Sequence, residues 1–226
     1  MTIVIDSVRQ SDSPLVETIM HGYTVDVGTL TRPAEAHWHM VLSKRPETTE
    51  LLLVGPWSSA GKINVEPDGE VLWIRFKVGV YMPHLLTRKL LDVETPLPGA
   101  SGSNFWLKGT TWEFPDYENT DTFLNRMVRE ELIVLDPVVD RALHDKQLDV
   151  SPRTVRHRFL QTTGMSQNQI YQVQRAWQAE ALLRQRTPIL DVVETAGYYD
   201  QPHLTRSLKQ FIGFTPTQIQ GQPATI

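Results

Sequence analysis

The chain has 226 residues, a net charge of −4 and no cysteine. Its 40% hydrophobic residues suffice for a folded core, which argues against a disordered chain. The lack of cysteine excludes disulfides and thiolate metal sites. No apolar run approaches the ~20 residues of a membrane helix, and the acidic, polar start of the sequence does not have the pattern of a signal peptide. These features predict a soluble, cytoplasmic protein with no membrane partner.

The charge is unevenly distributed along the chain. Residues 150–226 carry eight Lys and Arg against four Asp and Glu, a net charge of +4, whereas residues 1–149 carry −8. Because the electrostatic field at a surface follows the local charge, an acidic chain of this kind can still present a basic region to nucleic acid.

The first half of the chain has the patterns of β-strands. Hydrophobic residues alternate in residues 37–43 and 71–78, and residues 50–56 form a short apolar run that ends in Gly-Pro. Several short strands separated by turn signals are typical of a small β-barrel or sandwich. Residues 106–121 look too irregular for a strand and are predicted to cover one mouth of the barrel.

The hydrophobic period changes to that of a helix near residue 121. Residues 121–132 place Phe123, Leu124, Met127, Val128 and Leu132 on one stripe. This stripe has two interpretations: it packs on the barrel of its own chain, or it forms an antiparallel dimer contact.

The pattern stays helical from there to residue 219, and Asp136-Pro137 marks the boundary. The sequence therefore predicts an α+β protein with a β domain at residues 1–135 and an all-α domain at residues 136–226.

The helical half contains an internal repeat with an offset of 49 residues, between residues 151–166 and 200–215. The repeat aligns Ser151 with Asp200 as helix N-caps, Val155 and Phe159 with Leu204 and Leu208 as core positions, and Gly164 with Gly213 as left-handed helix ends. Two copies that begin and end alike are much stronger evidence for a helix than either copy alone.

The second copy follows a helical stretch, residues 187–196, and a sharp turn at Gly197. A helix, a glycine turn and a helix with a polar outer face form a helix-turn-helix unit, whose second helix enters the major groove of DNA.

A long helix at residues 166–186 joins the copies, with a predicted stripe of Ile170, Val173, Trp177 and Ala181. Its length, ~30 Å at ~1.5 Å per residue, is close to one turn of B-DNA, ~34 Å. We therefore expect the two copies to enter successive major grooves.

These segments resemble the DNA-binding domain of AraC/XylS-type transcriptional regulators over residues 137–220. The resemblance is carried by "SPRTVRHRF", "TTGMS", "ALL" and "PILDVVETAGYYDQPHLTRSLKQFIGFTPTQI". The chain departs from the family at "LHDKQLDV" (143–150), which is longer than the family's usual turn in the first unit. By resemblance, the acidic β half is a cupin-like domain that senses an effector or dimerises.

The resemblance also implies which side chains touch DNA. Arg is suited to the guanine edge, while other polar groups and helix N-termini hold phosphates. The alternative for any such helix is a solvated basic face. The predicted DNA-binding residues are Arg153, Thr154, Arg156 and His157 in the first copy, and Gln201, Pro202, His203, Thr205, Arg206 and Lys209 in the second. His203 has a second interpretation, in which its ring packs within the turn.

The β half contains a His-x-His pair, His37 and His39, as found in metal-binding cupins. The carboxylate expected four or five residues later is missing, because Ser43 and Lys44 stand there. No metal, cofactor or catalytic residue is therefore predicted. The candidates for an effector pocket are His37, Trp38, His39, Trp73, Arg75 and His84. The alternative is that the tryptophans of this half are simply barrel core.

Two functions from different classes remain. The first is a sequence-specific DNA-binding transcriptional regulator that responds to a small-molecule effector or to homodimerisation, with RNA polymerase, recruited or excluded, as a candidate partner. The second is a cupin-type metal-dependent enzyme with a helical tail. No nucleophile triad, phosphate loop or paired-carboxylate motif supports the enzyme, so the regulator is the prediction. A ligand-binding protein whose DNA-binding units have lapsed is disfavoured by the retained caps, glycines and basic faces.

Overall fold

The structure is a computed structural model and describes residues 3–85, 87–99, 103–144 and 146–221. The chain forms two compact units, each assembled from separate stretches. The first unit comprises Met1–Gly28, His37–Pro56 and Asn64–Ser166, and the second comprises Thr29–Ala36, Trp57–Ile63 and Gln167–Ile226. The division into functional domains at residue 135 stays a prediction.

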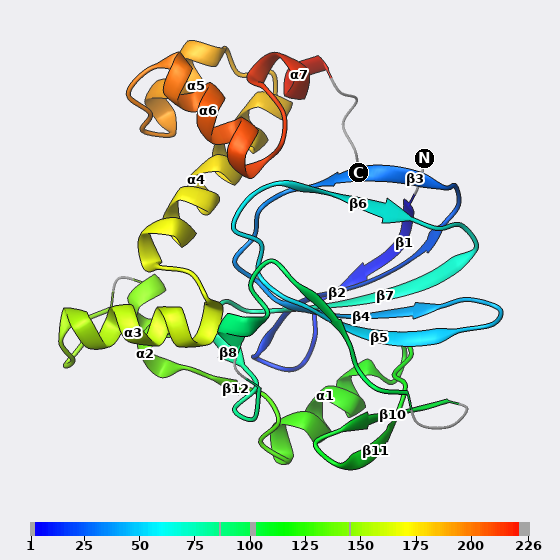
Figure 1. Cartoon of the computed structure of the whole chain (residues 1–226). Helices are drawn as coiled ribbons and strands as arrows, with labels where there is room; N and C mark the ends of the chain where they lie inside the picture. The colour runs from blue at the N-terminus through cyan, green and yellow to red at the C-terminus, as the bar shows by residue number, and fades with distance from the viewer. Residues whose placement is uncertain (1–2, 86, 100–102, 145, 222–226) are drawn as a thin grey trace. The chain divides into compact units, whose positions relative to one another are not determined.

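An antiparallel sheet of six strands forms the body of the first unit (Figure 1). Its spatial order is β1 (Ile3–Arg9), β2 (Val16–Thr24), β7 (Gly69–Phe76), β4 (His39–Lys44), β5 (Thr49–Val54) and β9 (Glu94–Pro96). Short pairs join β8 (Val80–Tyr81) to β12 (Val134–Leu135) and β10 (Asn104–Leu107) to β11 (Thr110–Glu113). A β-rich first half is confirmed, but within the described residues the strands form open sheets and no closed barrel.

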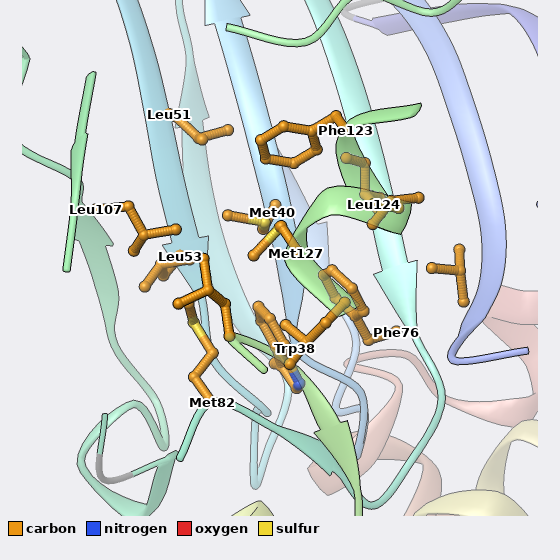
Figure 2. Close-up of a cluster of buried hydrophobic side chains, with 14 of the residues drawn as sticks. Trp38, Met40, Leu51, Leu53, Phe76, Met82, Leu107, Phe123, Leu124 and Met127 are labelled. Carbon is orange, nitrogen blue, oxygen red and sulfur yellow. The ribbon is translucent and has the colours of Figure 1, made fainter. Parts of the chain in front are cut away.

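One face of this sheet carries the core of the first unit. The register pairs Met40 with Ile74 and Leu42 with Leu72, so the alternating apolar residues predicted for β4 and β7 share that face. All four side chains are buried. Figure 2 shows how the cluster continues into the helix that covers it.

That helix is α1 (Thr120–Arg129). Phe123, Leu124 and Met127 are buried in the same cluster as the sheet residues, which confirms that the stripe packs on its own chain. Val128 is partly exposed and stands outside the stripe. The dimer interpretation stays a prediction.

The prediction for residues 106–121 was wrong in part, because β10 and β11 form a regular hairpin there. Trp106 pairs with Thr111 and Leu107 with Thr110, which leaves Lys108 and Gly109 as a two-residue loop. Both loop residues have positive φ, 51° and 76°, as the tight turn of such a hairpin requires. Gly109 was the local signal for this turn.

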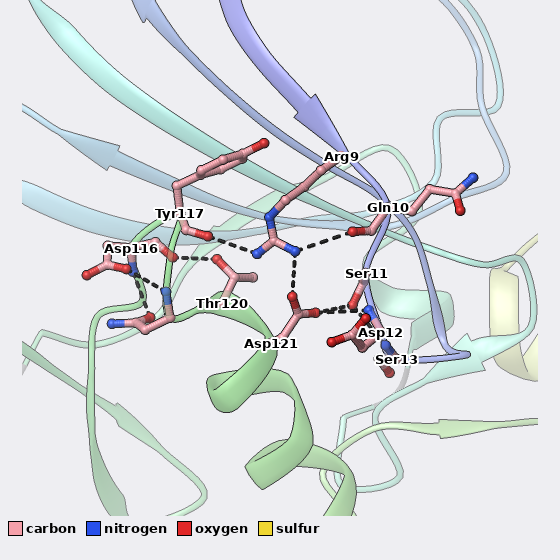
Figure 3. Close-up of polar contacts among 10 residues, drawn as sticks. Arg9, Gln10, Ser11, Asp12, Ser13, Asp116, Tyr117, Thr120 and Asp121 are labelled. Carbon is pink, nitrogen blue, oxygen red and sulfur yellow. Dashed lines mark hydrogen bonds and ion pairs between the residues drawn. The ribbon is translucent and has the colours of Figure 1, made fainter.

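A polar network ties the end of β1 to the first turn of α1 (Figure 3). The Arg9 guanidinium pairs with the Asp121 carboxylate and donates to the Tyr117 carbonyl, 2.9 Å away, and Ser11 also donates to Asp121. Burial on its own would raise the pKa of Asp121, but the hydrogen bonds from Ser11 and Arg9 and the positive charge of Arg9 outweigh it and lower the pKa.

A second polar cluster crosses the sheet at His21 of β2. Its Nδ1 lies 2.8 Å from Asp6 and its Nε2 3.0 Å from Glu70, which also pairs with Lys44. Burial would lower the pKa of His21, but the bonds to Glu70 and Asp6 and their charges outweigh it, so the pKa is raised. The bond from His21 and the charge of Lys44 lower the pKa of Glu70 against the effect of burial.

This cluster should make the stability of the first unit depend on pH. The contribution of His21 is complete below its ordinary pKa of 6.5 and is lost as pH rises through the raised value. The contribution of Glu70 is complete above its ordinary pKa of 4.5 and is lost as pH falls through the lowered value. We expect His21→Gln to cost on the order of 1 kcal/mol near pH 5.5, and less at pH 8.5 or pH 3. Urea unfolding of both proteins at the three pH values measures the difference, and a pH-independent cost would contradict the prediction.

The second unit contains the long helix α4 (Gln167–Arg184) and the shorter helices α5 (Ile189–Thr195), α6 (Gln201–Phe211) and α7 (Pro216–Gly221). It also contains most of the strand pair formed by β3 (Gly28–Arg32) and β6 (Gly61–Val65). The helices pack around buried faces of α4 and α6, including Val173, Leu183, Leu204 and Leu208.

Candidate DNA-binding surface

A packed aromatic turn sets the geometry between α5 and α6. The chain turns at Gly197, where φ is +68°, and buries Tyr198. The Tyr198 hydroxyl lies 3.0 Å from the Ser207 hydroxyl, and the Arg175 guanidinium of α4 lies 4.5 Å from the Tyr198 ring centroid. The ring therefore joins α4, the turn and the middle of α6 into one body.

Helix α6 has a buried face and an exposed basic face. It begins at the N-cap Asp200, whose carboxylate accepts the His203 N–H at 2.7 Å. Its buried side chains are Leu204, Ser207, Leu208 and Phe211, and its exposed predicted DNA-binding side chains are Gln201, Pro202, Arg206 and Lys209, with Thr205 half-buried. The spacing of Arg206 and Lys209 puts two cations on the exposed face.

His203 differs from the other predicted residues of α6. Its ring meets the Tyr198 ring edge to face at 5.2 Å, and its Nδ1 accepts the Tyr199 N–H at 3.4 Å. This confirms the interpretation in which His203 packs within the turn. Its proposed contribution to DNA binding is therefore to hold the start of α6.

The first helix-turn-helix unit has its own anchor at Asp136. This buried residue is the N-cap of α2 (Pro137–Leu143), and its Oδ1 accepts the N–H groups of Val138 and Val139 at 2.9 and 3.1 Å. Its Oδ2 lies 3.4 Å from Arg158 Nε of α3 (Pro152–Thr163). One carboxylate thus caps the first helix and pairs with the second.

Helix α3 exposes the side chains predicted to touch DNA. Arg153, Thr154, Arg156 and His157 are all exposed, and Phe159 on the opposite side is fully buried. The helix begins at Ser151, whose hydroxyl accepts the Thr154 N–H at 3.2 Å, just as Asp200 caps α6.

The sequence repeat is therefore confirmed as a structural repeat. Both copies have side-chain caps at the start and a left-handed glycine at the end, although Gly164 is itself the C-cap of α3 (φ +73°) and Gly213 follows the C-cap Ile212 of α6 (φ +89°). The separation of α3 and α6 stays a prediction, because the two helices belong to different compact units.

Residues 146–222 match a family model for a helix-turn-helix domain of the AraC type. The C-terminal part of this chain is therefore an AraC-type helix-turn-helix domain. The match covers α3 to α7 and begins after α2. Searches of curated proteins and of solved structures gave no match. This match supports a DNA-binding transcription regulator of the AraC type and indicates a regulator rather than an enzyme.

The buried face of α4 in this AraC-type domain differs from the stripe predicted for the long helix. Ile170 and Val173 are buried, but Trp177 and Ala181 are exposed, and the stripe continues through Ala176, Ala179, Glu180 and Leu183. The small side chains of Ala176 and Ala179 allow close packing in the domain. Trp177 lies at the edge instead, where its indole N–H finds an acceptor, the Ala34 carbonyl, at 2.8 Å.

The structure brings four of the six effector-pocket candidates to one face of the six-stranded sheet. His39 pairs with Arg75 across β4 and β7, and Trp73 lies two residues before Arg75 on the same face. His37 Nε2 lies 2.7 Å from the Glu17 carboxylate, and Arg75 Nη2 donates to His37 Nδ1 at 3.0 Å. Because Arg75 can only donate, His37 carries its proton on Nε2 and donates to Glu17.

The other two candidates lie elsewhere. Trp38 is on the core face, where its ring stacks on Phe76 at 4.0 Å and its indole N–H donates to the Val80 carbonyl at 2.7 Å. His84 follows β8 with an exposed ring, and partial desolvation and then the charge of Lys108 lower its pKa. Trp38 is therefore a core residue, in keeping with the alternative interpretation of the tryptophans.

The His-x-His pair is not part of a metal-binding cluster in the described part of the chain, where no three His, Asp or Glu side chains form a group able to hold an ion. The Arg75 cation beside His37 would also repel a divalent metal. In the same part of the chain, no helix is both long and apolar enough to cross a membrane.

One exposed residue beside α6 was missed from the sequence. Tyr199 is 91% exposed, in the turn just before the N-cap Asp200. In helix-turn-helix complexes the second helix enters the major groove and the first crosses the DNA backbone, so the exposed ring between them is a candidate for a backbone contact. The sequence signal for it was the pair of tyrosines before Asp200. Because Tyr198 fills the turn, Tyr199 is left to solvent.

Proposed function

We propose that this regulator reads a specific DNA sequence through the exposed faces of α3 and α6, which enter successive major grooves. The observation that carries the proposal is the exposed basic face of α6, opposite a fully buried face, within the segment that matches the AraC-type domain. Arg153, Arg156, Gln201 and Arg206 are the proposed base contacts, with Thr154, His157 and Pro202 beside them at the helix starts. Thr205, Lys209 and Tyr199 are the proposed backbone contacts.

Selection of DNA fragments from a random-sequence pool by the full-length chain tests this proposal. We expect enrichment of a sequence in which two short motifs lie about one helical turn apart. Footprinting of the enriched fragment should show protection on one side of the duplex. Enrichment of no sequence, with binding at low salt only, would contradict specific reading.

Lys209→Ala should weaken binding to all DNA sequences alike. If Lys209 contacts a phosphate, its loss reduces the slope of log Kobs against log salt concentration by about 1 and leaves the preferred sequence unchanged. Titrations of the enriched fragment and of a scrambled fragment at four salt concentrations measure both effects. A change in the preferred bases would assign Lys209 to base reading instead.

We further propose that an effector acts through the sheet face that carries His39, Trp73 and Arg75. Arg75, which pairs with Glu17 and donates to His37, supplies a cation on the same face as Trp73, and polar groups beside an aromatic side chain are found in sites for small polar ligands. A thermal-shift screen of small carboxylates against the parent and Arg75→Gln tests this. A ligand that stabilises the parent and not the variant supports the site, and equal shifts contradict it. Homodimerisation is the other proposed means of regulation, and sedimentation of the full-length chain tests it.

A further inference from the structure

The C-terminal end of α6 is held by strand segments from far earlier in the chain. The Ala34 N–H donates to the Phe211 carbonyl at 2.6 Å, and the Ala60 N–H donates to the Gln210 carbonyl at 2.7 Å. Both acceptors belong to the last turn of the helix, where carbonyl groups have no donor within the helix itself. The two segments therefore satisfy carbonyl groups that α6 would otherwise leave to water.

The peptide groups of Ala34 also connect α6 to α4. While the Ala34 N–H bonds α6, its carbonyl accepts the indole N–H of Trp177 at 2.8 Å, and the residue is completely buried. Ala34, in the connection between β3 and β4, is thus hydrogen-bonded both to the long helix α4 and to the recognition helix α6.

Close packing at Gly213 supports the same contact. A Cβ atom at this position would lie 2.5 Å from Thr31 Cγ2 and 3.4 Å from Ala60 Cβ. The left-handed glycine after α6 therefore also admits the strand segments at a distance that a Cβ atom beside the native Thr31 would not allow.

The two segments are fastened to each other as well. The backbones of Glu35 and Trp57 exchange hydrogen bonds of 3.0 and 2.8 Å, and the Arg32 guanidinium lies 3.8 Å from the Trp57 ring centroid. We name residues 29–36 and 57–63 the strand clamp. The clamp bonds the last turn of α6 and leaves Arg206 and Lys209 exposed, so it is compatible with DNA on the basic face.

We propose that the strand clamp is a positioning element for the second recognition helix. It holds α6 in the orientation that binds DNA, through residues that lie more than 100 positions earlier in the chain. The measurements of DNA affinity that test this inference rest on the proposed function. The contact between the clamp and α6 is tested without DNA, by disulfide cross-linking.

Trp177→Phe removes the indole donor and keeps an aromatic ring. We expect affinity for the enriched fragment to fall about 2- to 10-fold, as for the loss of one hydrogen bond that orients a binding element. Trp106→Phe is the matched control, because both tryptophans are partly exposed, 38% and 45%, and Trp106 lies in the β10–β11 hairpin of the first unit. The control should bind like the parent.

A disulfide between the clamp and the residue after α6 is designed to restore the affinity that Trp177→Phe loses. Thr31 Cβ lies 3.9 Å from the position of a Cβ at Gly213, within the ~3.5–4.5 Å of natural disulfides, and the chain has no cysteine of its own. The variant Thr31→Cys/Gly213→Cys should therefore cross-link under mild oxidation. Since the positive φ at position 213 strains the backbone in both redox states, the reduced form is the reference for the oxidised form.

In the Trp177→Phe background, oxidation should return the affinity lost on that substitution, and reduction should remove it again. A merely structural role of Trp177 would not respond in this way. Failure of the disulfide to form would overturn the clamp. Parental affinity of Trp177→Phe, or a weakened affinity that oxidation does not restore, would overturn its positioning role. Failure of the parent chain itself to enrich a sequence would instead count against the proposed function.

Discussion

Trp38→Ala is expected to lower the free energy of unfolding of the first unit by about 3–5 kcal/mol, the range for large aromatic-to-alanine changes in protein cores. The side chain is 2% exposed and stacks on Phe76 within the main cluster (Figure 2). Its loss also leaves the Val80 carbonyl without the indole donor. Urea unfolding followed by circular dichroism measures the change.

Trp73 provides the comparison for Trp38. It lies on the opposite sheet face and is only half-buried, so Trp73→Ala should cost less than Trp38→Ala. If Trp38 instead lined an effector pocket with room around it, its truncation would cost about 1 kcal/mol or less, as at a site away from the core. That result would contradict the packing described above.

Arg206→Ala is expected to weaken binding to the enriched DNA sequence about 5- to 150-fold, equivalent to ~1–3 kcal/mol, and to relax the preference at one base pair. Arg206 is exposed on α6, on the side away from the buried Leu204 and Leu208. A bidentate contact to guanine accounts for both effects, because its loss removes the hydrogen bonds that discriminate against other bases. Repeating the selection with the variant shows which position loses its preference.

Arg129→Ala is the control for the loss of one positive charge. Arg129 ends α1 in the first unit and is exposed, so its removal changes the net charge equally without touching α6. It should leave the preferred sequence unchanged. If Arg206→Ala binds the enriched sequence as tightly and selectively as Arg129→Ala, Arg206 does not read a base.

Local sequence signals determined the helix-turn-helix units and much of the sheet. Caps, left-handed glycines and apolar positions act within a few residues, so Ser151 and Gly164, like Asp200 and Gly213, predict where α3 and α6 begin and end. The period of two in residues 71–78 likewise predicted β7 and its buried face. The basic residues of α6 could be assigned to its exposed face for the same reason.

Only the tertiary structure decided which partners meet across long stretches of chain. The periodicity of α4 assigned Trp177 to the core stripe, whereas an acceptor from residue 34 placed it at the edge of the helix. Ala34 and Ala60 carry no sequence signal for capping α6, because their contribution is made by backbone N–H groups that every residue except proline has. Gly213 was readable as a helix end, but its second role, admitting Thr31, depends on a neighbour far along the chain. Short-range patterns set each element, and packing between distant segments set what each element contacts.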